Sequence, residues 1–136
     1  MTYNEKKRYL EGYISSVRRI KGLQRELEEW QTIATNITQK LREIPIRSSN
    51  PGNKMEDCAM QMAEIEDKLL KEMQEANLKR DQVQESVSKI RDTRRREIIE
   101  LRYVHGLSVN RISYELDKDR DNVYKIIRRT IKSMDI

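Results

Sequence analysis

From Tyr3 to Ile44 the apolar residues recur at spacings of three and four positions, the pattern of a coiled-coil seam, with one early step from Ile20 to Leu23. The seam residues are Leu10, Tyr13, Val17, Ile20, Leu23, Leu27, Trp30, Ala34, Ile37, Leu41 and Ile44. This spacing places them on one face of a helix, and the stretch contains no proline. We therefore expect one long helix, ended by Pro45, which withholds a backbone donor and restricts the residue before it.

A second stretch without proline or glycine runs from about Met55 to Arg91. Its apolar residues again share one helical face, which Arg80 interrupts: Met55, Cys58, Met62, Ile65, Leu69, Met73, Ala76, Val83, Val87 and Ile90. Between the two stretches, residues 47–53 consist largely of turn-forming residues. Because a short loop between two long helices gives an antiparallel hairpin, residues 1–92 are expected to form one.

Composition supports an all-α class and excludes several others. Charged residues make up 38% of the chain and the mean hydropathy is −0.92, with no Phe, so apolar side chains are too few for a large globular core. A single cysteine, Cys58, excludes an intramolecular disulfide. The sequence shows neither a signal peptide nor an apolar run of about 18 residues that could span a bilayer. We expect a cytoplasmic protein with no membrane partner.

The net charge of +5 is distributed unevenly along the chain. The first expected helix is basic, the second is acidic, and residues 93–136 carry 11 Lys and Arg against 7 Asp and Glu. Opposite charges on the first two helices are the balance expected of helices that pack together, and a basic end favours a polyanion. We expect the hairpin to self-associate into a dimer or higher oligomer. The alternative is a monomeric hairpin closed by the C-terminal domain.

Residues 93–136 predict three shorter helices joined by short turns. These expected helices are 93–104, 108–116 and 119–134. Gly106 suits the left-handed position after a helix end, and Ser108 and Asp119 suit the N-cap. Three helices in this order have the layout of a DNA-binding helix-turn-helix.

The last expected helix separates into an apolar and a polar face when projected at about 100° per residue. The apolar face contains Val123, Ile126, Ile127, Thr130, Ile131 and Met134. On the polar side we expect contacts to base edges in a major groove from Asp121, Asn122, Tyr124, Lys125 and Arg128. Contacts to phosphates are expected from Ser108, Arg111, Arg120, Arg129 and Lys132. The simpler interpretation is that any exposed helix carries charges of this kind.

These residues also support a family resemblance. Residues 97–116, followed by 122–125 and 128–131, resemble region 4 of sigma factors. With its long helical N-terminal part, the chain resembles the ArpU and RinA type of phage and prophage transcription regulators, found in bacteriophages of Gram-positive bacteria. The resemblance implies that 108–116 is the positioning helix and 119–134 the recognition helix, with a core of Ile112, Leu116, Val123 and Ile127. Two positions depart from the pattern: Asp117 replaces the usual turn glycine, and Ser113 replaces the usual alanine.

Two weaker features leave their interpretation open. Arg94, Arg95 and Arg96 could bind phosphates or an acidic partner, or could be a solvated helix start. His105 stands alone, and a helix-end residue fits it better than a zinc ligand, because zinc needs three or four convergent ligands. The sequence contains no glycine-rich phosphate loop, no paired nucleophile and base, and no carboxylate pair in an apolar setting. We expect no enzyme, no cofactor and no metal.

Taken together, the sequence predicts a sequence-specific regulator of transcription that binds double-stranded DNA and oligomerises through its hairpin. By resemblance it is an activator of phage or prophage genes in the cytoplasm of a bacterial host. Two alternatives remain. One is a sigma-like protein that acts on RNA polymerase, and the other is an oligomeric component of phage assembly or DNA packaging.

Overall fold

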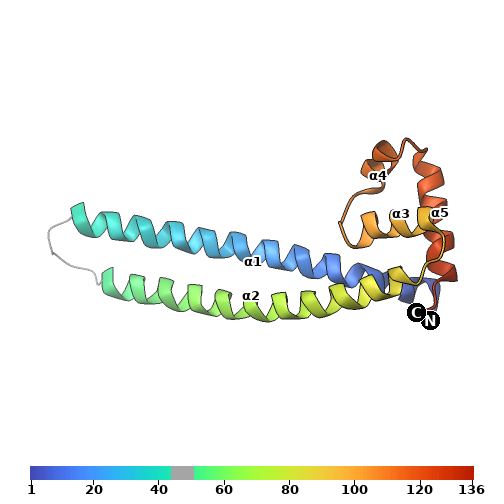
Figure 1. Ribbon diagram of the computed structural model, residues 1–136. Helices are drawn as coiled ribbons and strands as arrows, with labels where there is room; N and C mark the ends of the chain where they lie inside the picture. Colours follow the sequence, from blue (N-terminus) through green and yellow to red (C-terminus); the bar gives the residue numbers. More distant parts are fainter. Residues whose placement is uncertain (44–50) are drawn as a thin grey trace. The chain divides into compact units, whose positions relative to one another are not determined.

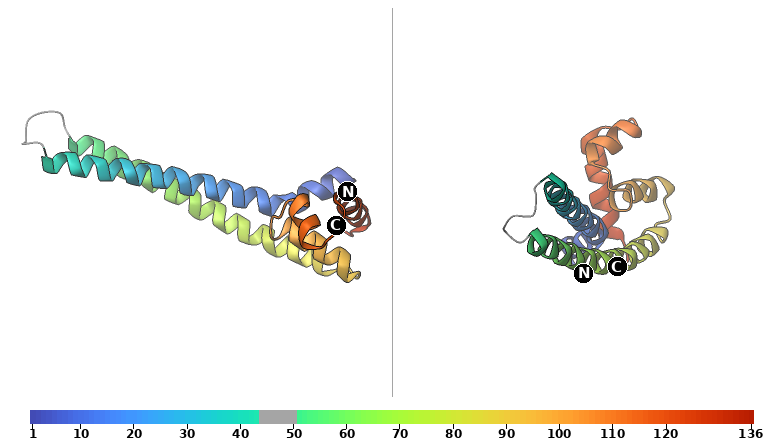
Figure 2. Two further views of the ribbon diagram at one scale, coloured as in Figure 1. Left: turned by 90° about the horizontal axis from the view of Figure 1, so that it is seen from above. Right: turned by 90° about the vertical axis from the view of Figure 1, so that its left-hand side faces the viewer.

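The computed structural model contains five helices within the residues it describes, 1–43 and 51–136, and no strand occurs there. Side chains are described for residues 1–40 and 53–136. The helices are α1 (Tyr3–Glu43), α2 (Pro51–Ser88), α3 (Thr93–Tyr103), α4 (Val109–Glu115) and α5 (Arg120–Ser133) (Figure 1). The predicted all-α class is confirmed. The pairing of the first two helices is also confirmed, because α1 and α2 pack together (Figures 1 and 2).

The start and end of α2 differ from the prediction. The helix begins at Pro51, earlier than the expected Met55, and ends at Ser88 rather than Arg91. Proline suits the first turn of a helix because its missing N–H would have no intrahelical partner there. The predicted turn at 47–53 therefore overlaps the start of α2. The predicted helix stop at Ile44 and Pro45 lies outside the described residues.

The chain divides into two compact units. One comprises residues 1–17 and 75–136, and the other residues 18–74. The first unit thus contains the start of α1 and the end of α2, from residue 75, together with α3, α4 and α5, whereas the sequence suggested a boundary at residue 92. The cause is a shared core: Leu10 of α1 and Val83 and Val87 of α2 are buried in one cluster with residues of the three shorter helices.

Within this first unit, α3, α4 and α5 pack against one another. Ile98, Ile99 and Tyr103 of α3 and Val109 and Ile112 of α4 are buried. From the predicted apolar face of α5, Ile126 is partly buried and the others are buried: Val123, Ile127, Thr130, Ile131 and Met134. Leu116, which the resemblance placed in this core, packs against it and is partly buried. The opposite side of α5 is therefore left for solvent or a partner.

In the second unit, residues 18–74, the seam between the two helices is buried at Cys58 and Ile65. The prediction for Met73 is wrong, because this side chain is 46% exposed. Glu72 takes the seam position instead, with Nε of Arg19 2.7 Å from its Oε1. The reason is the spacing: from Ile65 the seam advances by four to residue 69, by three to Glu72 and by four to residue 76.

Candidate nucleic-acid interface

The turn between α4 and α5 is closed by the two residues that depart from the sigma-like pattern. Asp117 has a left-handed φ of 49°, the conformation for which glycine is usual. The backbone N–H of Lys118 donates to the carbonyl oxygen of Ser113 at 3.0 Å, and the Ser113 hydroxyl donates to the carbonyl oxygen of Lys118 at 2.5 Å. An alanine at 113 would lack this second bond. The hydrogen bond of Ser113 therefore stabilises a turn in which Asp117 adopts an unfavourable left-handed backbone conformation.

The helices on either side of this turn begin at the predicted N-caps. Ser108 accepts a hydrogen bond at its Oγ from the N–H of Arg111 at 3.1 Å. Asp119 occupies the N-cap of α5 in extended backbone geometry, but its side chain makes no cap hydrogen bond. The predicted capping is thus made by the side chain at α4, whereas at α5 only the backbone position matches.

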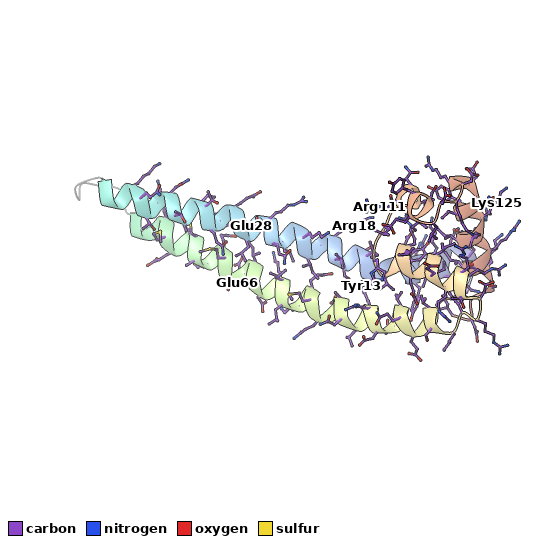
Figure 3. The ribbon with its side chains drawn as sticks, turned by 45° about the horizontal axis from the view of Figure 1, so that its top comes forward. Tyr13, Arg18, Glu28, Glu66, Arg111 and Lys125 are labelled. Atoms are coloured by element: carbon purple, nitrogen blue, oxygen red, sulfur yellow. The ribbon has the colours of Figure 1, made fainter. Side chains whose placement is uncertain are left out.

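The ten residues expected at a DNA interface are all exposed. Asp121, Asn122, Tyr124, Lys125 and Arg128 lie on α5, opposite its buried residues. The five expected phosphate contacts are Ser108, Arg111, Arg120, Arg129 and Lys132, and they come from the start of α4 and from α5. Figure 3 labels one side chain on each of these two helices, Arg111 on α4 and Lys125 on α5. Nothing in the geometry assigns these side chains to bases or phosphates, so their roles stay predictions.

Three of these cationic side chains have partners in the structure. Nε of Arg111 lies 2.9 Å from Oε1 of Glu115, one turn along α4, in an exposed ion pair. The guanidinium of Arg120 lies over the ring of Tyr124, 5.6 Å from its centroid. Arg128 lies at the same distance from the ring of Tyr3, at the start of α1. The last contact joins opposite ends of the sequence, so no local pattern could have predicted it.

Two hollows of the first unit are lined by residues of the predicted polar side of α5. One, of about 330 Å³, lies against the turn at residues 117–119 and is lined on α5 by Asn122, Lys125, Ile126 and Arg129. The other, of about 290 Å³, is lined by residues of α1, α3, α4 and α5. Lys125 lines both hollows.

The wall of the second hollow contains a tyrosine with a perturbed pKa. Burial raises the pKa of Tyr103 to about 12. Its hydroxyl is therefore protonated at neutral pH and carries no negative charge next to the neighbouring cations. Arg102 on the same helix donates from Nη1 to the carbonyl oxygen of Leu107 at 3.0 Å, which holds its guanidinium in place.

The arginine triplet at the start of α3 has a partly structural role. Arg96 donates from Nη1 to the carbonyl oxygen of Ile90 at 3.1 Å, whereas Arg94 and Arg95 are exposed. Asp92 is the N-cap and accepts a hydrogen bond from the N–H of Arg95 at 3.1 Å, which holds the pKa of its carboxyl below the ordinary value. A solvated helix start thus describes Arg94 and Arg95, whereas Arg96 connects α3 to the segment that follows α2.

Other kinds of site find little support in the described residues. Within 1–43 and 51–136, no three His, Cys, Asp or Glu side chains are grouped so that they could hold a metal ion. His105 is exposed beside Gly106, whose φ is +70°. In the same part of the chain, no helix is long and apolar enough to cross a membrane.

A family model described as "Protein of unknown function (DUF1492)" matches residues 46–135. No curated protein and no solved structure matches the chain. The matched span covers all of α2, α3, α4 and α5.

Proposed function

The chain belongs to the DUF1492 family, whose description assigns no activity, and we propose that it is a sequence-specific regulator of transcription that binds double-stranded DNA. In this proposal α4 and α5 form a helix-turn-helix, with α5 as the recognition helix in a major groove. By the resemblance to the ArpU and RinA type of regulators, the protein activates phage or prophage genes. It carries out no chemical reaction of its own.

The observation that supports this proposal best is the division of α5 into two faces. Val123, Ile127 and Ile131 anchor one face in the core, and the other face presents an amide, a phenol and cations to solvent. Arginine and lysine pair with guanine edges, asparagine pairs with adenine, and aspartate accepts from the amino group of cytosine. A helix fixed on one side and equipped in this way on the other suits direct readout of base edges.

Helices α4 and α5 also carry cations of the kind that bind the DNA backbone. Arg120 and Arg129 are on α5, and Arg111 lies on α4. Residues 93–136 carry a net charge of +4, so the domain as a whole attracts a polyanion. Phosphate contacts fix the register of a protein on DNA but carry no sequence information, so these residues hold α5 at the groove while α5 reads it.

Selection of bound duplexes from a random library tests the proposal directly. Recovery of a common motif by the purified full chain, without RNA polymerase, is the expected result. A palindromic motif would further indicate that two copies bind with two-fold symmetry. Recovery of no motif, together with binding to RNA polymerase, would instead favour the sigma-like alternative.

The assignment of α5 is tested by two lysines on that helix. Lys125→Ala should weaken binding to the selected duplex by about 1–3 kcal/mol and have a smaller effect on a scrambled duplex, because Lys125 is assigned to base edges. Lys132→Ala is the matched control and should weaken both duplexes equally, because Lys132 is assigned to phosphate. Titrations followed by fluorescence anisotropy measure both. Equal losses on both duplexes for Lys125→Ala would remove it from the reading face.

A further inference from the structure

The second hollow beside α5 is a cationic cleft that includes residues far from the predicted helix-turn-helix. Four cations line it: Lys7 of α1, Arg102 of α3, and Lys125 and Arg128 of α5. Every charged residue lining it in the described part of the chain is a cation. The walls also include two tyrosines, Tyr3 and Tyr103. The cleft therefore favours an anion, and its volume of about 290 Å³ is large enough to admit a phosphate group.

Two of the cations are held in place before any ligand binds. Arg102 donates to the carbonyl oxygen of Leu107 at 3.0 Å, and a guanidinium has five N–H groups, so donors remain for an anion. Arg128 is held over the ring of Tyr3. Fixed side chains lose less conformational entropy on binding than mobile ones. The cleft is accordingly preorganised on the sides formed by α3 and α5.

Lys7 is the cation that α1 contributes. Its Nζ lies 3.9 Å from Oε1 of Glu11, one turn along the helix, and the two side chains are 46% and 45% exposed. Exposed pairs of this kind contribute little, so the pairing does not prevent Lys7 from binding a phosphate. The neighbouring Lys6 has a structural role instead, because its Nζ donates to the carbonyl oxygens of Lys132 and Met134 at the end of α5. Lys6 thus secures the start of α1 against the end of α5.

We infer that Lys7 and Arg102 bind a phosphate of the DNA backbone beside the groove that receives α5, so that the start of α1 is part of the DNA interface. This inference rests on the proposed function. A backbone phosphate is favoured over a free anion because Lys125 and Arg128, on the wall of the same cleft, belong to the face proposed to read the bases. An anion in this cleft would therefore lie next to DNA that α5 had already engaged.

The test compares two neighbouring cations of α1 in the full chain. Lys7→Gln removes a charge from the cleft. Arg8→Gln is the matched control, because Arg8 is also exposed but is not among the residues lining the cleft in the described chain. Binding to the selected and scrambled duplexes is titrated at several salt concentrations, with helicity checked by circular dichroism.

Lys7→Gln should weaken binding to both duplexes alike, about threefold to tenfold at fixed salt. It should also flatten the slope of log affinity against log salt by about 0.9, the value for one lost phosphate contact. Arg8→Gln should change the slope much less, and Lys7→Arg should restore it.

Four outcomes would overturn the inference. Equal effects of Lys7→Gln and Arg8→Gln, or a loss confined to the selected duplex, would do so while leaving the proposed function intact. Saturable binding of inorganic phosphate that depends on Lys7, with an unchanged DNA slope, would assign the cleft to a free anion. Failure of the unaltered chain to bind any duplex would reject the proposed function itself, and the inference with it.

Discussion

Gly106 sits in the loop between α3 and α4, where the chain needs a left-handed backbone. Its φ is +70°, and a Cβ at this position would lie 3.2 Å from Cδ1 of Ile14 on α1. An L-residue in this conformation costs about 1–2 kcal/mol, and here the side chain of Ile14 must also move. Gly106→Ala should therefore lower the free energy of unfolding by about 1–2 kcal/mol, measured by chemical denaturation.

Gly22 provides the matched control for this substitution. It lies inside α1, and a Cβ there would meet nothing within 4 Å. Alanine in a helix interior is more stable than glycine by about 0.5–1 kcal/mol, so Gly22→Ala should raise the free energy of unfolding by that amount. Two alanine substitutions of opposite sign would separate backbone conformation from a general effect of removing glycine. A neutral or stabilising Gly106→Ala would contradict the strained turn.

At the scale of a helix, the carboxyl of Asp92 makes the start of α3 sensitive to pH. Its hydrogen bond with the N–H of Arg95 lowers its pKa below the ordinary value of 3.8. As the pH falls through 3.8, the carboxyl of Asp92 takes up a proton in the unfolded chain before it does so in the folded chain. The stabilisation is present above pH 3.8 and is lost as the pH drops through the lowered pKa.

Asp92→Asn keeps an N-cap acceptor but removes the titrating group. The thermal midpoint of the unaltered protein should therefore fall more steeply below about pH 4 than that of the variant. Thermal melts of the two proteins between neutral and acidic pH measure this difference. Parallel curves over the acidic range would show that the carboxyl of Asp92 does not contribute.

The buried face of a helix could be predicted where the spacing of its own apolar residues determines it. It was harder to predict where packing against a second helix determines it. On α5 the residues with about 100° periodicity are the buried ones, because a short amphipathic helix has one way to face its core. In the hairpin, residues 72 and 73 are adjacent, and only one of them can occupy the seam position. Hydropathy favoured Met73, but the register of α2 placed Glu72 there, beside Arg19. The periodicity of a single helix does not determine its register against a second helix.

At the scale of the whole molecule, the contacts that could not be predicted are those between distant parts of the sequence. Two contacts join the start of the chain to its last helix. Arg128 lies over the ring of Tyr3, and Lys6 donates to the carbonyl oxygen of Met134 after the end of α5. Both depend on the burial of Leu10 with Val83 and Val87, which brings α1 and α2 into the core of the first unit. The sequence showed each helix but not this shared core, so the start of α1 was assigned to the hairpin alone.

Self-association through the hairpin is a further expectation, and two exposed leucines on α2 test it. Leu70 is 57% exposed, and one of its neighbours one turn away, the 46% exposed Met73, is apolar, whereas Glu66, Asp67 and Gln74 are acidic or polar. Leu78 is 65% exposed, but the helix surface around it carries the polar or acidic residues Gln74, Glu75, Asp81 and Gln82. A second copy would therefore gain more apolar burial at Leu70 than at Leu78.

Leu70→Lys should accordingly shift the protein towards monomer, whereas Leu78→Lys should leave its association unchanged. Sedimentation equilibrium over a range of concentrations gives the mass of each protein. Circular dichroism should show equal helicity in both variants, because neither leucine is buried in the chain itself. An unaltered protein that is monomeric throughout would reject the oligomer and leave the monomeric hairpin closed by the C-terminal domain. An oligomer that both variants retain would place the interface away from Leu70, because burying a charged side chain in an apolar contact between two copies is costly.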